Sequence, residues 1–268
     1  MGIPSLDPFL ACGRHNVWRG DELGGADAQV VATGHAALDA QLPGGGWPVG
    51  ALTELLQATP AAHVWQLLLP ALARAVQAGS GPVVLIGAPH EPFGSALAAG
   101  GLPPEALLWV RSEAPAARLW ACEQALRCAE VAAVLAWLPQ ARVGELRRLQ
   151  LAAAQHEALL FVFRPALMAQ SASPARLRLQ LADAGSPQQM DIHILKRRGP
   201  PLTAPVTLPA RSERLAALLA ASQLRRKARQ QQAGEAVVQG GAVVRLALPL
   251  AGTEQERIHA LDRIALAA

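Results

Sequence analysis

The chain has 268 residues, of which 51% are hydrophobic and only 16% are charged, and its net charge is +4. This length accommodates one large α/β domain with appendages, and the small positive charge permits contact with nucleic acid without requiring it. The three cysteines have no CxxC spacing, which argues against a disulfide framework and against a zinc site. No apolar run is long and pure enough to span a bilayer, and the first residues lack a signal-peptide pattern, so we expect a cytoplasmic protein without membrane contact.

The first part of the chain predicts an arm followed by the start of a folded core. Residues 1–33 combine Gly, Pro and isolated polar residues with little periodicity, which indicates an arm. Residues 34–42 predict a short helix that ends before a Gly-rich turn, and residues 51–56 predict an apolar strand. The stretch 62–77 has helical periodicity, and we expect Pro70 to kink this helix.

Strands and helices then alternate as far as residue 163. The strands are predicted at 82–87, 107–110, 131–137 and 158–163, and the helices at 115–129 and 143–156. The strands are continuous apolar runs and do not alternate with polar residues. Such runs are typical of a parallel sheet that helices cover on both faces.

The pattern changes after residue 164. Residues 176–182 and 190–196 alternate polar and apolar side chains, which predicts two antiparallel edge strands. The predicted fold class is therefore α/β, with a mostly parallel sheet covered by helices and ending in an antiparallel hairpin.

The last part of the chain has the composition of an interaction tail. Residues 212–232 predict a helix with a basic run, and a linker of small residues and two short elements follow. We therefore divide the chain into an arm (1–33), a folded domain (34–210) and a basic, partly flexible tail (211–268).

From Leu38 the sequence LDAQLPGGGWPVGALTEL resembles the core of the RecA/RadA recombinases, and the similar spacing continues to about residue 196. The resemblance implies a RecA-like fold. A phosphate-binding loop uses glycines to wrap the phosphates, a lysine to contact them and a hydroxyl to hold Mg²⁺. The matching positions here are occupied by Gln57, Ala62, His63 and Val64.

Two acidic positions implied by the same resemblance are also replaced. The position of the catalytic glutamate is Pro89, although Glu91 lies nearby, and the position of the metal-linked aspartate is Trp137. Phosphoryl transfer depends on positioning and charge stabilisation, so the loss of these groups predicts a protein without catalytic activity, cofactor or metal.

This combination resembles the ImuA family, in which RecA-like folds carry degenerate nucleotide sites. The segment Leu67–Leu72 (LLLPAL) and the segment Ile194–Gly199 (ILKRRG) match that family. The resemblance implies an accessory factor in SOS-induced translesion DNA synthesis that joins the nucleoid when engaged. Its implied partners are an ImuB-like Y-family polymerase homologue, the second replicative polymerase α subunit and RecA, with weak contact to DNA. Two alternatives stay open: a SulA-type inhibitor of cell division that acts on FtsZ, and a DNA-dependent ATPase with an unorthodox loop.

Three basic groups are candidate contacts to a partner or to DNA. They are Arg142, Arg147 and Arg148; Lys196, Arg197 and Arg198; and Arg225, Arg226, Lys227 and Arg229. The competing interpretation of each group is a solvated helix face or strand end, and for the tail group a packed terminal helix.

Three further side chains have two readings each. His63 stands near a helix start, where it could bind a phosphate or be an ordinary polar residue. Trp137, at a strand end, could fill the space of a lost nucleotide or contact a partner. The sequence leaves the same two interpretations open for Trp47.

Overall fold

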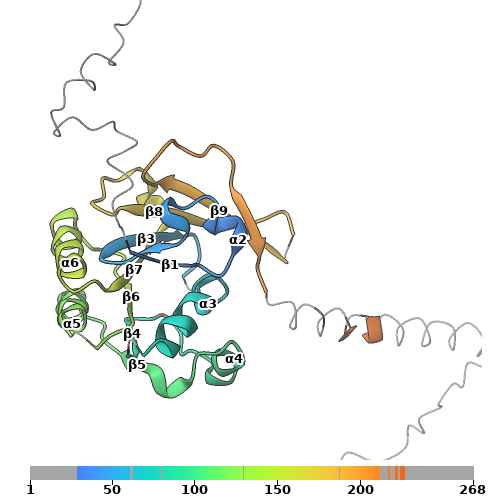
Figure 1. Ribbon diagram of the computed structural model, residues 1–268, viewed down its shortest axis with the longest axis horizontal. Coiled ribbons are helices and arrows are strands. Elements are labelled where there is room, and N and C mark those ends of the chain that lie inside the picture. Colours follow the sequence, from blue (N-terminus) through green and yellow to red (C-terminus); the bar gives the residue numbers. More distant parts are fainter. Residues whose placement is uncertain are drawn as a thin grey trace, which may run out of the picture. The chain divides into compact units, whose positions relative to one another are not determined.

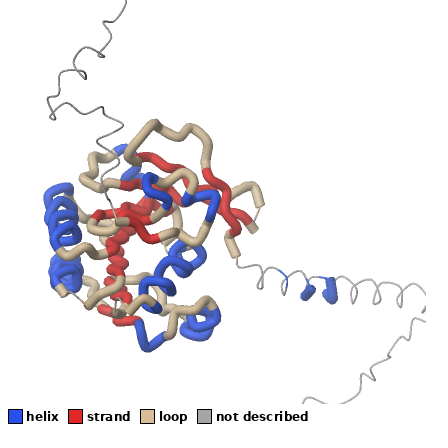
Figure 2. Tube along the Cα trace, in the orientation of Figure 1, coloured by secondary structure: helices blue, strands red, loops and turns tan. Residues whose placement is uncertain are grey.

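The chain divides into two units, residues 1–216 and residues 217–268. An eight-stranded sheet forms the centre of the first unit. In this computed structural model the described residues are 29–60, 63–79, 81–128, 130–186, 188–211, 217, 221, 222 and 224–226. Helices lie on both sides of the sheet, and loops connect them to the strands (Figure 1 and Figure 2).

The sheet is mostly parallel, and the order of its strands is β10-β9-β8-β3-β7-β6-β4-β5. The strands are β3 (Ala51–Gln57), β4 (Val83–Ile86), β5 (Leu107–Val110), β6 (Ala133–Trp137), β7 (Leu159–Pro165), β8 (Leu177–Asp183), β9 (Gln189–Lys196) and β10 (Val206–Pro209). Strands β3 to β8 run parallel to one another, whereas β9 is antiparallel to both β8 and β10. The predicted fold class is confirmed, and this arrangement is consistent with a RecA-like core.

Two hydrophobic clusters hold the helices against the two faces of the sheet. One face packs against α2 (Ala36–Asp39), α3 (Val64–Gln77) and α4 (Gly94–Ala99), and the other against α5 (Pro115–Arg127) and α6 (Val143–Gln155). In Figure 1, α5 and α6 lie together on one side of the sheet and α3 on the other. Strands β4 and β6 are apolar along their whole length because both faces of the sheet are buried there.

Short elements complete the first unit. A two-stranded ribbon joins β1 (Val30–Val31) to β2 (Trp47–Pro48), so residues 30 and 31, which were predicted to belong to the arm (1–33), pair with the Gly-rich turn region instead. The described residues include the 3₁₀ turns η2 (Pro43–Gly45), η3 (Pro104–Ala106) and η4 (Ala166–Gln170). Trp47 is fully buried and packs edge-on against Phe161 at 5.3 Å, so the structure places its side chain in the core.

The structure differs from the predicted elements most clearly at β8. Residues 176–182 were expected to form an antiparallel edge strand, but β8 lies inside the sheet and is parallel to β3. An alternating pattern is typical of a strand whose polar side chains face solvent, but the side chain of Arg178 does not face solvent. Arg178 lies opposite Glu54 of β3 and is buried with it.

Other differences concern short elements. The sequence did not predict α4 or β10, and the helix expected at residues 34–42 covers four residues in α2. Helix α3 continues through Pro70 to Gln77. Of the second unit, the described residues are helical and exposed, and the elements predicted after residue 226 lie outside the described part of the chain.

Candidate functional site

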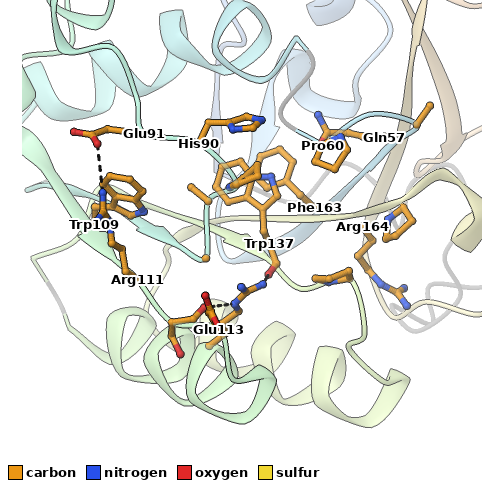
Figure 3. A pocket seen from close by; sticks show the side chains of 18 residues that line it. Gln57, Pro60, His90, Glu91, Trp109, Arg111, Glu113, Trp137, Phe163 and Arg164 are labelled. Atoms are coloured by element: carbon orange, nitrogen blue, oxygen red, sulfur yellow. Dashed lines mark hydrogen bonds and ion pairs between the residues drawn. The ribbon is translucent and has the colours of Figure 1, made fainter. Parts of the chain in front are cut away.

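A pocket of about 840 Å³ opens at the carboxyl edge of the parallel sheet. Its walls come from the ends of several strands, including Gln57 at the end of β3, Trp109 on β5, Trp137 at the end of β6, and Phe163 and Arg164 on β7 (Figure 3). Ligands of open α/β sheets bind at this edge because loops from neighbouring strands meet there. We call this cavity the carboxyl-edge pocket.

The floor of the carboxyl-edge pocket is aromatic. Trp137 stacks on Phe163 with ring centroids 4.2 Å apart and an interplanar angle of 16°. Trp137 is only 7% exposed, and its ring belongs to the hydrophobic cluster around α3. Among the described residues, the buried indole N–H groups of Trp137 and Trp109 have no hydrogen-bond partner. The indole of Trp137 therefore occupies space at the sheet edge that a smaller acidic side chain would leave open.

Charged side chains at the rim of this pocket contact groups of the protein itself. The guanidinium of Arg111 lies over the ring of Trp109 at 4.0 Å and pairs with Glu91 at 3.3 Å. Arg118 donates a hydrogen bond from Nε to the carbonyl of Ser112 at 2.5 Å. Glu91, which lies two residues after Pro89 in the sequence, is thus engaged by an arginine.

The start of α3 has a geometry unlike that of a phosphate-binding loop. His63 is the N-cap residue in the left-handed region, with φ of 60°, and its Nε2 lies 2.7 Å from Oδ1 of Asp183 at the end of β8. Val64 is fully buried in the core, and Ala62 lies outside the described residues. The imidazole therefore contacts a carboxylate of the neighbouring strand, and neither His63 nor Val64 lines the carboxyl-edge pocket.

The two positions at which the RecA/RadA resemblance implies acidic residues both lie in the pocket lining. Pro89 follows β4 and Trp137 ends β6, and both line the carboxyl-edge pocket with Gln57. The described part of the chain holds no group of three His, Cys, Asp or Glu side chains that could bind a metal ion.

Behind one wall of the pocket lies a buried charge cluster that the sequence did not reveal. Glu54 of β3 is fully buried, and its carboxylate accepts hydrogen bonds from Arg164 Nη1 at 2.7 Å and from Arg178 Nε at 2.5 Å. The two arginine side chains are 6% and 8% exposed. Further guanidinium N–H groups donate to backbone carbonyls, one of them to that of Ala141 at 3.0 Å. A charged residue inside the apolar run of β3 was the available signal, because a buried carboxylate requires a partner.

The first basic group lies around α6. Arg142 is the N-cap residue, and its backbone N–H donates to the carboxylate of Glu145 at 2.7 Å. Arg148 pairs with Glu123 of α5 at 2.5 Å, whereas Arg147 is exposed on the same helix. Part of the positive charge of this group is therefore neutralised within the protein.

The second and third basic groups belong to different units of the chain. Lys196 is the last residue of β9, Arg197 and Arg198 follow it, and all three line a cavity at the sheet edge opposite the carboxyl-edge pocket. In the tail, Arg225 and Arg226 are helical and exposed, while Lys227 and Arg229 lie outside the described residues. Within the first unit, the group around α6 and the group at the end of β9 therefore do not share a cavity.

Comparisons with known proteins do not add a family to these observations. A scan against protein-family models finds no match to the chain, and a search of curated proteins finds none either. No helix in the described ranges is long and apolar enough to cross a membrane. What the site can do therefore follows from its own geometry.

Proposed function

We propose that this protein is a non-catalytic accessory factor in SOS-induced translesion DNA synthesis that assembles an error-prone polymerase complex through protein–protein contacts. The observation that carries the proposal is the start of α3. There His63 replaces the phosphate-binding lysine and is held by Asp183, and Val64 replaces the Mg²⁺-binding hydroxyl and is buried. A RecA-like core with this loop retains the fold but not the groups that stabilise a transferring phosphoryl group.

The pocket lining supports the same proposal. Trp137 and Phe163 form a stacked aromatic floor where a metal-linked aspartate would otherwise stand. Aromatic side chains and arginines are enriched at protein interfaces, and both occur here, with Arg111 over Trp109 at the rim. A surface of this composition suits contact with a protein partner better than the binding of a triphosphate.

The process and the partners are proposed from the sequence. The segments Leu67–Leu72 and Ile194–Gly199 resemble the ImuA family. The proposed partner is an ImuB-like Y-family polymerase homologue, joined by the second replicative polymerase α subunit and RecA. Direct contact with DNA, through the exposed arginines, is weak in this proposal.

The first experiment measures nucleotide binding and turnover by the purified chain, with and without single-stranded DNA. We expect no ATP hydrolysis in either condition. The His63→Lys variant is a useful comparison, because it supplies the missing cation without the glycines and the hydroxyl and should stay inactive. Turnover by the wild-type chain that rises with DNA would contradict the proposal and favour a DNA-dependent ATPase.

The second experiment captures the tagged full chain from its own host after DNA damage and identifies the proteins that co-purify. Recovery of a Y-family-like polymerase or of a replicative α subunit supports the proposal. Recovery of FtsZ instead would replace it with a SulA-type inhibitor of cell division. The full-length variant Arg225→Glu/Arg226→Glu, compared with Arg127→Glu on α5, tests whether the tail cations contribute to capture.

A further inference from the structure

A second cavity lies at the amino edge of the sheet, opposite the carboxyl-edge pocket. It has a volume of about 470 Å³ and is lined by residues before and at the start of β8, by the end of β9 and the turn that follows, and by the β1–β2 ribbon. All of these elements belong to the first unit of the chain. We call this cavity the amino-edge pocket.

The amino-edge pocket is strongly positive. Arg176, Lys196, Arg197 and Arg198 all line it, and none of its described lining residues is acidic. Four arginines elsewhere in the described residues pair with carboxylates: Arg111, Arg148, Arg164 and Arg178. Within the described residues, the four cations of this pocket form no ion pair of that kind. No ion pair among the described residues therefore compensates their charge.

Two of these cations are held in place by neutral groups. Lys196 donates from Nζ to the carbonyl of Ser173 at 3.1 Å. Arg197 donates from Nε to the carbonyl of Pro200 at 3.0 Å, and its guanidinium also donates to the carbonyl of Gln41. A carbonyl fixes the position of a cation without cancelling its charge. The pocket is thus pre-organised for an anionic ligand, which lowers the entropic cost of binding.

The remaining walls of the pocket are apolar. Val30, Pro43, Pro48 and Leu177 contribute to them, and no described lining residue is aromatic. Single-stranded nucleic acid is usually bound by aromatic side chains on which bases stack, so this lining does not favour that ligand. A concave apolar wall bordered by cations is complementary to a peptide that carries both carboxylates and aliphatic side chains.

We infer that the amino-edge pocket is a docking site for an acidic peptide segment of a partner protein, with an aliphatic side chain seated against Val30 and Pro48 and flanking carboxylates on the four cations. The inference rests on the proposed function in that the chain acts through protein partners. The occupant is defined by charge complementarity and does not depend on the identity of the polymerase. The site is distinct from the carboxyl-edge pocket.

The test uses the full chain and a fluorescein-labelled peptide that repeats Glu-Glu-Leu, followed by fluorescence anisotropy. The matched peptide that repeats Gln-Gln-Leu removes the carboxylates and keeps the aliphatic groups. A labelled oligo(dT) strand serves as the nucleic-acid probe. We expect the glutamate peptide to bind more tightly than both other probes, and its affinity to fall as salt is raised.

Arg176→Ala and Arg198→Ala are the test variants, because both side chains are exposed and neither substitution removes core packing. The double variant should weaken binding of the glutamate peptide about tenfold or more, since charged hydrogen bonds are lost. Arg127→Ala, which removes an equal charge per substitution from exposed α5, should leave the affinity within about twofold. Circular dichroism checks that the variants remain folded.

Three results would overturn the inference. They are equal affinity for the glutamate and glutamine peptides, an equal loss in the Arg127→Ala control, and tighter binding of oligo(dT) that the double variant abolishes. The last result would assign the pocket to nucleic-acid phosphates. A failure of peptide binding would contradict the docking site but would not change the result of the capture experiment. The docking site and the proposed function are therefore tested by different results.

Discussion

Replacing Glu54 with glutamine tests the buried charge cluster behind the carboxyl-edge pocket. The carboxylate of Glu54 is fully buried and accepts hydrogen bonds from Arg164 at 2.7 Å and from Arg178 at 2.5 Å. Glutamine keeps the shape of the side chain but removes its charge. It also places an amide N–H₂ group, a donor, against one of two guanidinium donors. Two nearly buried cations are then left without a counter-charge.

The expected cost follows from the burial of all three side chains. Breaking a buried ion pair by removing one partner costs about 3–5 kcal/mol, because the remaining charge stays desolvated. A domain of this size is stable by about 5–15 kcal/mol, so the substitution should remove a large fraction of the free energy of unfolding. The surface pair of Arg111 with Glu91 provides the contrast. Both side chains are mostly exposed, and Glu91→Gln should cost at most about 1 kcal/mol because solvent screens that pair.

Urea unfolding followed by circular dichroism measures both costs as shifts of the midpoint at a constant m-value. The double variant Glu54→Gln/Arg164→Met should be destabilised by less than the sum of its two single variants, because it removes one of the stranded cations. A cost below about 1 kcal/mol for Glu54→Gln would refute the reasoning, since buried charges that lose a partner cost several times more. Additive costs in the double variant would refute the coupling.

Three further predictions concern single side chains in and around the two pockets. The His63→Gly variant should be more stable than the His63→Ala variant by about 0.5–1 kcal/mol in urea unfolding. Alanine is strained in the left-handed conformation at φ of 60°, and this strain outweighs the larger entropy that glycine gives the unfolded state. Equal stabilities of the two variants would argue against this backbone conformation. In the Cys12→Ser variant, DTNB should react with the exposed Cys128 in the native protein and with Cys122 only after unfolding. The reason is that burial raises the pKa of the Cys122 thiol. Rapid labelling of Cys122 in the native protein would show that its helix opens. Trp137→Ala should lower the free energy of unfolding by about 3–5 kcal/mol in the urea assay, as expected for a large buried aromatic side chain. A loss below about 1 kcal/mol would mean that the ring is a surface group and not part of the core.

Local patterns in the sequence were sufficient to predict the parallel core. The continuous apolar runs of β3, β4, β6 and β7, and the periodic helices between them, follow from a sheet covered on both faces, and each of these signals extends over only a few neighbouring residues. The replacements in the loop after β3 were equally readable, because Gln57, His63 and Val64 can be compared position by position with the groups that bind phosphate.

The position of β8 in the sheet could not be predicted from local patterns. The alternating residues of β8 predicted an antiparallel edge strand, but Arg178 is buried against Glu54 on the neighbouring strand. These two residues are 124 positions apart in the chain, and Arg164, the other partner, is 110 positions from Glu54. No window of local sequence contains both members of either pair.

The sequence by itself therefore determined the kind of fold and which side chains follow β3, whereas tertiary structure decided which charges meet. The contact of His63 with Asp183 and the gathering of Arg176 with Lys196 and the two arginines that follow it both depend on strand order. Secondary structure follows from interactions between near neighbours in the chain. Strand order instead depends on how whole elements bury their apolar faces together, and only that packing brings distant side chains within contact distance.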